Sequence, residues 1–173
     1  MKRLSLTLPL LLAARLGCAA DLPAAGEKAP AFSLQSQDET TISLEKLKGR
    51  WVVLYFYPKD FTSGCTIEAH NFQRDLAKYQ KVNAVIVGVS LDSVASHKDF
   101  CAKEGLNFKL LADTEGAASK AYGSVATHND KTYSARNTFL IDPAGVIRKV
   151  YVKVNPTTHS EAVLADLAAL QAS

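Results

Sequence analysis

Beyond its first 20 residues, the 173-residue chain has no long hydrophobic run and no excess of charge of either sign. The formal net charge of +3 comes from Lys2, Arg3 and Arg15, and the 17 acidic residues are balanced by the remaining basic ones. A nucleic-acid-binding surface needs clustered lysine and arginine, and a transmembrane helix needs about 20 consecutive apolar residues. We therefore expect neither nucleic-acid binding nor a membrane span after the N-terminal segment.

The N-terminus has a basic start, which is followed by an apolar stretch over residues 4–14. This stretch is too short to span a bilayer, and small residues follow it up to Ala20. We therefore predict an export signal in residues 1–20, cleaved after Ala20, and a periplasmic location for the mature protein. A lipid anchor on Cys18 and an uncleaved apolar arm are the alternatives.

Cysteine is scarce, with three copies in the chain. If Cys18 leaves with the export signal, Cys65 and Cys101 remain as an even pair in an exported protein. Such a pair is either a structural disulfide or a redox pair. The sequence around Cys65 decides between the two.

A linker over residues 21–30 precedes a single predicted domain, residues 31–172. The hydrophobic pattern of this domain alternates between short buried strands and amphipathic helices. This order predicts an α/β fold with a mixed central sheet and helices on both faces, which is the thioredoxin-like architecture with an N-terminal extension. We expect strands at residues 31–35, 40–44, 51–57, 82–90, 107–111, 137–142 and 146–152, and helices at residues 64–79, 93–104, 115–122 and 159–171.

Residues 57–66 join a buried strand to the start of a helix and place Cys65 in the first helical turn. Unpaired backbone N–H groups and the positive end of the helix dipole stabilise a thiolate there, and the thiolate is the nucleophilic form. A thiolate that attacks a peroxide expels hydroxide, so hydrogen-bond donors have to hold both oxygens. Thr62 offers a hydroxyl, the turn at Gly64 lets the backbone approach closely, and Pro58 shields the sulfur.

These residues resemble the peroxiredoxin signature, in which a proline is followed four residues later by threonine or serine and three residues after that by the peroxidatic cysteine. Pro58, Thr62 and Cys65 occupy these positions. Residues 66–69 (Thr-Ile-Glu-Ala) resemble the bacterioferritin comigratory protein, or Q-type, subfamily, although many members have proline where this chain has Ser63. The resemblance extends over nearly the whole chain after the signal. It implies a thiol peroxidase that reduces hydrogen peroxide and organic hydroperoxides without a cofactor.

Two further residues are assigned roles by the same resemblance. Arg136 begins a predicted buried strand, in a segment similar to the one that carries the family's active-site arginine, and a fixed guanidinium there favours the thiolate and binds the peroxide. Glu68 matches a family glutamate that orients this arginine. Taken alone, Arg136 fits an exposed ion pair worth about 0–1 kcal/mol; beside the Cys65 motif, the catalytic role is favoured. For Glu68, a solvated acid near the positive end of the helix dipole stays open as an alternative.

The resemblance also implies a resolving cysteine, which captures the oxidised Cys65 before further oxidation. In one variant of the subfamily, the resolving cysteine lies five residues after the peroxidatic one, but this chain has His70 at that position. In another variant, the resolving cysteine lies on the helix after the next strand, and Cys101 occupies that helix. We therefore predict a Cys65–Cys101 disulfide, with a buried apolar filler as the alternative for Cys101. Two such helices rarely bring their Cα atoms within the roughly 7 Å that a disulfide needs. We expect both helix ends to unwind locally, near Gly64 and Gly105.

Three other functions fit the sequence less well. A thiol–disulfide oxidoreductase usually carries C-x-x-C, whereas Thr62 and Glu68 occupy the positions three residues before and after Cys65. A copper-carrying chaperone of the same fold needs C-x-x-x-C, and Ala69 occupies the second of these positions. A catalytically silent, partner-binding domain gives no reason to retain Thr62, Cys65 and Arg136 together.

The four histidines share no metal-ligand spacing, so we expect no metal site, and we expect His70 and His97 to be solvated helix residues. The expected partners are a peroxide substrate and a thioredoxin-type protein reductant, which for an exported protein works outside the cytoplasm. The subfamily resemblance implies a monomer. For the proposed chemistry, Arg136 has to lie close to Cys65, and the thiol has to be within reach of solvent.

Overall fold

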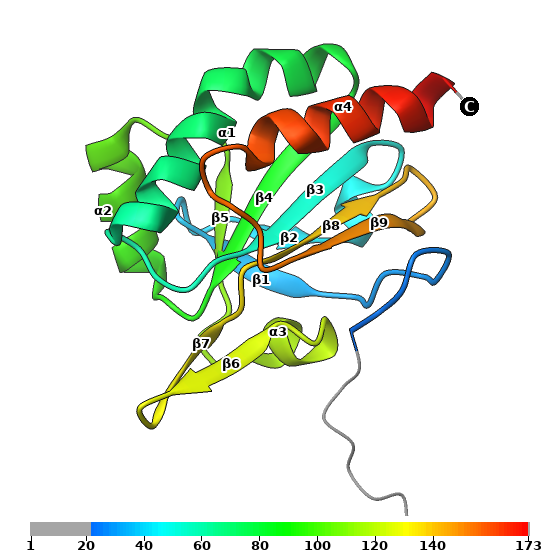
Figure 1. The fold of residues 1–173 in the computed structure, drawn as a ribbon. Helices are drawn as coiled ribbons and strands as arrows, with labels where there is room; N and C mark the ends of the chain where they lie inside the picture. Colours follow the sequence, from blue (N-terminus) through cyan, green and yellow to red (C-terminus); the bar gives the residue numbers. More distant parts are fainter. Residues whose placement is uncertain (1–21, 173) are drawn as a thin grey trace, which may run out of the picture.

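The computed structural model describes residues 22–172, so the predicted export signal and Cys18 lie outside the described residues. This part of the chain folds around a mixed seven-stranded sheet with the order β2-β1-β5-β4-β3-β8-β9 (Figure 1). Strands β3, β4 and β5 are parallel, and each outer strand is antiparallel to its neighbour. The strands are β1 (Ser33–Ser36), β2 (Thr41–Ser43), β3 (Trp51–Phe56), β4 (Ala84–Ser90), β5 (Lys109–Ala112), β8 (Asn137–Ile141) and β9 (Ile147–Val152).

The neighbouring strands β3 and β4 are buried on both faces, as their continuous apolar runs predict. Gly88 of β4 permits an especially close approach between neighbours. A side-chain carbon at Gly88 would lie 2.6 Å from Leu110 and 2.7 Å from the ring of Tyr55. Because Gly88 has no side chain, Tyr55 can pack against Phe72, with ring centroids 4.8 Å apart. This packing fixes the end of β3 beneath the first helix.

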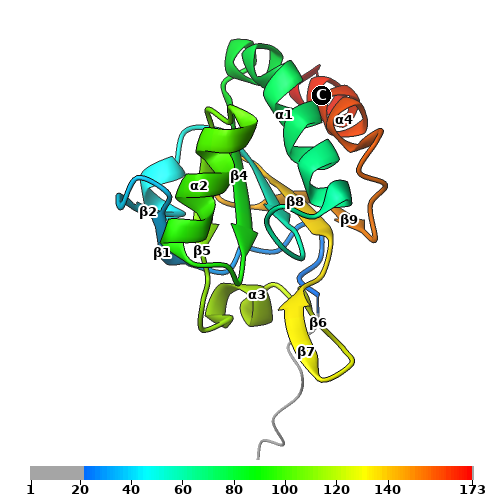
Figure 2. The same cartoon turned by 90° about the vertical axis from the view of Figure 1, so that its left-hand side faces the viewer.

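Helices cover both faces of the sheet, as expected, but unequally (Figures 1 and 2). On one face lie α1 (Ser63–Lys81), α2 (Val94–Glu104) and α4 (His159–Ala172), and their core includes Cys65 and Cys101. The short α3 (Ala117–Ala121) lies on the other face. A 3-10 turn, Glu45–Leu47, follows β2. Both cysteines therefore share one hydrophobic core, between the sheet and the three longer helices.

The sequence-based prediction missed a small hairpin, which β6 (Val125–His128) and β7 (Lys131–Ser134) form apart from the main sheet. It lies beside α3 at the lower end of the view in Figure 1. The turn between the strands consists of Asn129 and Asp130, with φ of 48° and 58°. Positive φ at both central residues is the condition for a tight hairpin turn, which asparagine and aspartate tolerate. The strands themselves are short and only one of their residues is buried, so they give a weak hydrophobic pattern.

The other predicted strands and helices are present, and their ends differ from the prediction by a residue or two. The ends of α2 follow clear local signals. Ser93 caps the start, because its hydroxyl accepts a hydrogen bond from the Ser96 N–H, and Gly105 ends the helix in the left-handed conformation. Within residues 22–172, no helix is both long and apolar enough to cross a membrane.

Candidate active site

Cys65 lies in the first turn of α1, directly after the loop that follows β3. Thr62 is the N-cap residue: its backbone is extended, and its carbonyl accepts a hydrogen bond from the Thr66 N–H at 2.9 Å. The Thr62 hydroxyl donates to the Lys59 carbonyl at 3.0 Å and therefore stabilises the loop rather than the helix. The first backbone N–H groups of α1 have no helical partners, so together with the helix dipole they favour an anion at Cys65.

Arg136 immediately precedes β8 and contacts Cys65. Strand β8 pairs with β3 in antiparallel register, with Thr138 opposite Tyr55, so the start of β8 lies beside the end of β3. Arg136 Nη2 donates a hydrogen bond to Cys65 Sγ at 3.3 Å. Arg136 Nη1 donates to Glu68 Oε2. The guanidinium therefore bridges the thiol and a carboxylate one helical turn away, and the expected proximity of Arg136 to Cys65 is present.

Glu68 is buried, with a side chain 1% exposed, so it is not a solvated acid. Burial raises the pKa of Glu68 to about 7, against the opposing influence of the Arg136 guanidinium. No group in residues 22–172 hydrogen-bonds to Glu68 Oε1, which is consistent with the dominance of burial. Burial also disfavours the charged guanidinium, but Glu68 and Cys65 together raise the pKa of Arg136. The arginine is therefore a permanent cation at this site.

Cys65 is more deeply buried than expected, because only 2% of the residue is exposed to solvent. The start of α1 and the Arg136 guanidinium crowd the sulfur. A side-chain carbon at Gly64 would lie 3.4 Å from Arg136 Nη2 and 3.8 Å from Pro156 Cγ. A peroxide therefore has to enter a tight site that is largely closed to solvent. In such a site, hydrogen bonds to a developing charge are stronger than they are in bulk water.

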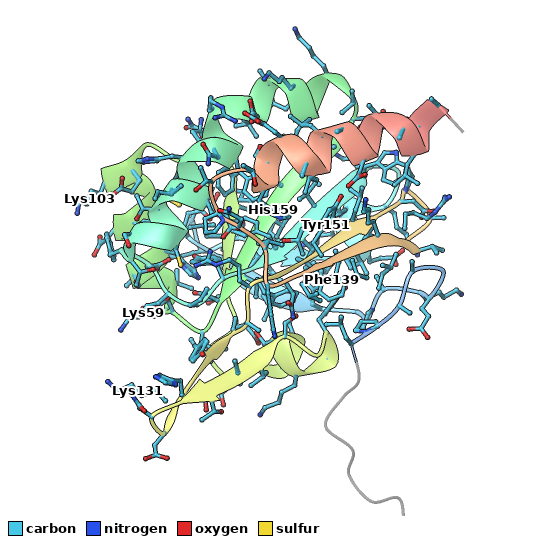
Figure 3. All side chains as sticks on the ribbon, in the orientation of Figure 1. Lys59, Lys103, Lys131, Phe139, Tyr151 and His159 are labelled. Atoms are coloured by element: carbon cyan, nitrogen blue, oxygen red, sulfur yellow. The ribbon has the colours of Figure 1, made fainter. Side chains whose placement is uncertain are left out.

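A cavity of about 500 Å³ borders the active-site loop on the side of the β6–β7 hairpin. Pro58 and Lys59 line it from the loop, and Lys131 and Tyr133 line it from the hairpin. Figure 3 shows Lys59 and Lys131 on the same side of the molecule. Pro58 is half-buried at this boundary.

Cys101 lies near the end of α2 and is 8% exposed. Cys65 and Cys101 are both free thiols in this structure. Burial raises the pKa of Cys101 to about 12, and the negative charge of Asp60 adds to the effect. Because the thiolate is the nucleophile, Cys101 is a poor nucleophile as long as α2 is intact.

His159 is a buried residue near the site that the sequence did not single out. It lies at the start of α4, where Figure 3 shows it beside Tyr151. Its Nε2 lies 2.8 Å from the Thr138 hydroxyl. Burial, and then the nearby charge of Arg136, lower the pKa of His159 to about 4. A neutral histidine therefore lies within the electrostatic influence of the arginine, and only the tertiary packing of α4 against the sheet brings it there.

The two helix histidines differ from each other. His70 is half-exposed and lies 2.9 Å from the carboxylate of Glu104, which agrees with a solvated position. The prediction for His97 was wrong, because its side chain is fully buried and contacts Asp60 at 2.9 Å. The sequence could not indicate this contact, because Asp60 lies on a loop 37 residues before His97 and not one helical turn away. Tyr122 packs with Phe56 and Phe139 in the core on the opposite face of the sheet.

The structure thus brings Cys65, Arg136, Glu68 and Gly64 together, places Thr62 at the adjacent helix cap and Pro58 on the loop, and leaves Cys101 on a separate helix. We then compared the whole chain with known protein families and with known proteins. The AhpC/TSA family matches residues 25–150. Peroxiredoxin Bcp of Xanthomonas campestris is 40% identical over 153 residues, which cover 86% of this chain and 94% of that protein.

Solved structures agree with these sequence matches. A cysteine-to-serine mutant of PrxQ from Xylella fastidiosa superposes with a TM-score of 0.82 at 34% identity, covering 86% of this chain and 97% of that one. The bacterioferritin comigratory protein of Xanthomonas campestris, studied for alkyl peroxide reduction in trapped intermediate and ligand complexes, has a TM-score of 0.77 at 37% identity. This match covers 87% of the present chain and 98% of that protein.

Proposed function

Because this chain belongs to the AhpC/TSA family and is a thiol-dependent peroxidase of the Bcp/PrxQ peroxiredoxin type, we propose that Cys65 is the thiol that attacks the peroxide. One observation carries this assignment: Arg136 Nη2 lies 3.3 Å from Cys65 Sγ, at the start of a helix. A fixed cation and a helix N-terminus both favour a thiolate. Among the described residues 22–172, Cys101 has no hydrogen-bonded cation, and it lies near the end of α2 rather than at a helix N-terminus.

The first step is a displacement at oxygen. The Cys65 thiolate donates an electron pair to the nearer peroxide oxygen, the O–O bond breaks, and the other oxygen leaves as hydroxide or alkoxide, which takes a proton to become water or an alcohol. Cys65 is oxidised to the sulfenic acid, and the peroxide is reduced. The Arg136 guanidinium, which Glu68 holds in place, stabilises the charge as it moves from sulfur to oxygen. Thr62 and Gly64 shape the loop, and Pro58 shields it.

In the second step, the Cys101 thiolate attacks the sulfur of the Cys65 sulfenic acid. The hydroxide that leaves takes up the proton that Cys101 has lost, so the products are a disulfide and water. A thioredoxin-type protein then reduces this disulfide. The Xanthomonas campestris peroxiredoxin Q has been solved as two cysteine-to-serine mutants, and the two mutated positions are separated by the same number of residues as Cys65 and Cys101. This equal spacing supports Cys101 as the resolving residue.

A peroxide-consumption assay tests both assignments. We compare the wild-type protein with Cys65→Ser and Cys101→Ser, using hydrogen peroxide and a thioredoxin-type reductant. Cys65→Ser should consume no peroxide. Cys101→Ser should consume one equivalent of peroxide and then stop, because its sulfenic acid cannot form the disulfide that the reductant recognises. Equal activity in all three proteins would contradict both assignments.

We further propose that the protein is exported and works as a monomer. The basic start and the short apolar stretch over residues 4–14 support export. The mass of the protein recovered from the periplasmic fraction should correspond to a chain that begins at Asp21, whereas an acylated chain that begins at Cys18 would establish a lipid anchor instead. Sedimentation equilibrium of the reduced protein should give the mass of one chain, and a dimer would contradict the monomer.

A further inference from the structure

Asp60 is a buried carboxylate on the loop that carries the active-site motif. It is 3% exposed and lies five residues before Cys65. The Tyr57 hydroxyl donates to Asp60 Oδ1 at 2.7 Å. The Ser96 hydroxyl donates to Oδ2 at 2.7 Å, and His97 Nδ1 lies 2.9 Å from the same oxygen. Three groups, two of them on α2, thus hold one loop carboxylate.

His97 links this loop to the helix of the second cysteine. Its side chain is fully buried and lies one helical turn before Cys101, on the same face of α2. Since an ionised carboxylate only accepts hydrogen bonds, His97 Nδ1 carries the proton and donates it to Asp60. His97 Nε2 has no hydrogen-bond partner among residues 22–172. His97 Nδ1 also lies 3.3 Å from the Tyr57 hydroxyl, so the contact with Asp60 is the shorter of the two polar contacts that hold the imidazole.

Two neighbouring contacts join the same two segments. The backbone N–H of Asp60 donates to Asp92 Oδ2 at 2.9 Å, just before α2 begins. The ring of Phe61 packs edge-on against Phe100, with centroids 5.1 Å apart. Residues 60 and 61 of the loop thus contact consecutive turns of α2, up to the residue before Cys101. Figures 1 and 2 show α2 and α1 on the same face of the sheet.

We propose that the Asp60–His97 pair is a positioning pair that clamps the active-site loop on α2, and that its opening limits the rate at which Cys101 reaches the oxidised Cys65. This inference rests on the proposed role of Cys101 as the resolving thiol. The buried pair is stable only while both partners remain together, because separating them inside the core leaves an uncompensated charge. Unwinding the end of α2 breaks the contact and exposes both groups to water.

The clamp affects the second chemical step and not the first. Attack on the peroxide uses Cys65 and Arg136, neither of which contacts Asp60 or His97 through a hydrogen bond. Formation of the disulfide requires Cys101 to lose its proton and to move towards Cys65, and both need α2 to open. A weaker clamp should therefore speed formation of the disulfide and leave oxidation of Cys65 unchanged.

The test measures both steps in the full chain by rapid quenching after mixing with one equivalent of hydrogen peroxide. Mass spectrometry then gives the fractions of sulfenic acid and disulfide over time. The variants are His97→Asn, which replaces the imidazole by a shorter amide, and Asp60→Asn, which removes the negative charge. Loss of one charge-assisted hydrogen bond should accelerate disulfide formation about tenfold or more. The rate constant for sulfenic acid formation should stay within about twofold of the wild-type value.

Two further variants act as controls. Lys98→Gln changes an exposed residue next to His97 and should leave both rate constants unchanged. Ser96→Ala removes one of the neutral donors to Asp60 and should give a smaller acceleration than His97→Asn, so it keeps the test decisive if the larger changes prevent folding. The faster variants should also form less sulfinic acid at high peroxide concentration, because the sulfenic acid is captured sooner.

Unchanged disulfide formation in His97→Asn, Asp60→Asn and Ser96→Ala would overturn the clamp. An equal change in both rate constants would also overturn it, because the substitutions would then act on the whole site. The Cys101→Ser variant separates this failure from a failure of the proposed function. If Cys101→Ser still forms the intramolecular disulfide, the resolving role is wrong. If it forms none and the three clamp variants match wild type, only the clamp is wrong.

Discussion

Arg136 and Cys65 are separated by 71 residues, yet the guanidinium donates a hydrogen bond to the sulfur at 3.3 Å. The antiparallel pairing of β8 with β3 produces this contact, because it places the start of one strand beside the end of the other. Cys65 then receives the backbone N–H groups of a helix N-terminus from one element and a cation from another. We propose that this combination of donors stabilises the nucleophilic thiolate of Cys65. The combination exists only in the folded chain.

Replacing Arg136 should slow the oxidation of Cys65. Arg136→Met removes both the charge and the donor, and we expect the second-order rate constant for peroxide to fall by about 10²- to 10³-fold, as for the loss of one donor to a developing oxyanion. Arg136→Lys keeps the charge but loses the two-armed geometry, so it should give an intermediate rate constant. Stopped-flow kinetics with hydrogen peroxide measure both values.

A surface arginine provides the matched control. Arg148 is partly exposed and pairs with Asp142 at 3.4 Å, on the strand that follows β8. Arg148→Met should therefore leave the rate constant unchanged. A rate constant for Arg136→Met that matches that of Arg148→Met would show that the guanidinium beside Cys65 does not assist the reaction.

Glu68 should make the folded protein less stable as the pH rises through weakly acidic values. Its pKa is raised by burial from an ordinary 4.5 to about 7. Between these values the unfolded chain has lost this proton while the folded chain retains it, so the free energy of unfolding falls as the pH rises. The Glu68→Gln variant has no titrating group at this position and therefore serves as the reference. The free energy of unfolding of wild type relative to Glu68→Gln should fall by at most about 3 kcal/mol from pH 4.5 to pH 7, as measured by urea denaturation; parallel pH curves would contradict the raised pKa.

His159 should have the opposite effect on stability over nearly the same pH range. Burial and Arg136 lower its pKa from 6.5 to about 4. Between these values the unfolded chain binds a proton that the folded chain does not, so the free energy of unfolding falls as the pH is lowered. His159→Gln cannot bind this proton and keeps an amide near the Thr138 hydroxyl. Relative to this variant, wild type should lose at most about 3 kcal/mol between pH 6.5 and pH 4, and a constant difference would mean that folding does not lower the pKa of His159.

Local patterns predicted most of the fold and the main pair of the site. Continuous apolar runs gave β3 and β4, helical spacing gave α1, and Ser93 and Gly105 bounded α2. The resemblance of the Cys65 motif and of the Arg136 segment to known patterns then predicted that two distant residues meet. The structure adds how they meet, through the pairing of β8 with β3.

Contacts between distant polar residues could not be predicted in the same way. His97 has an ordinary helical position in the sequence, and only the folded loop places the carboxylate of Asp60 against it. His159 is buried because α4 packs on the sheet near Arg136, which no local pattern indicates. The depth of Cys65 has the same origin, since residues from several elements close over the sulfur.

The most direct test of the peroxidatic role of Cys65 is to trap its first oxidation product. The Cys101→Ser variant is mixed with one equivalent of hydrogen peroxide and a reagent selective for sulfenic acids, and the labelled peptide is identified by mass spectrometry. We expect one label per chain, located on Cys65. The double variant with Cys101→Ser and Arg136→Met should carry no label when the reaction is stopped within the half-time measured for Cys101→Ser alone. A protein that consumes peroxide while Cys65 remains an unmodified thiol would contradict this role of Cys65.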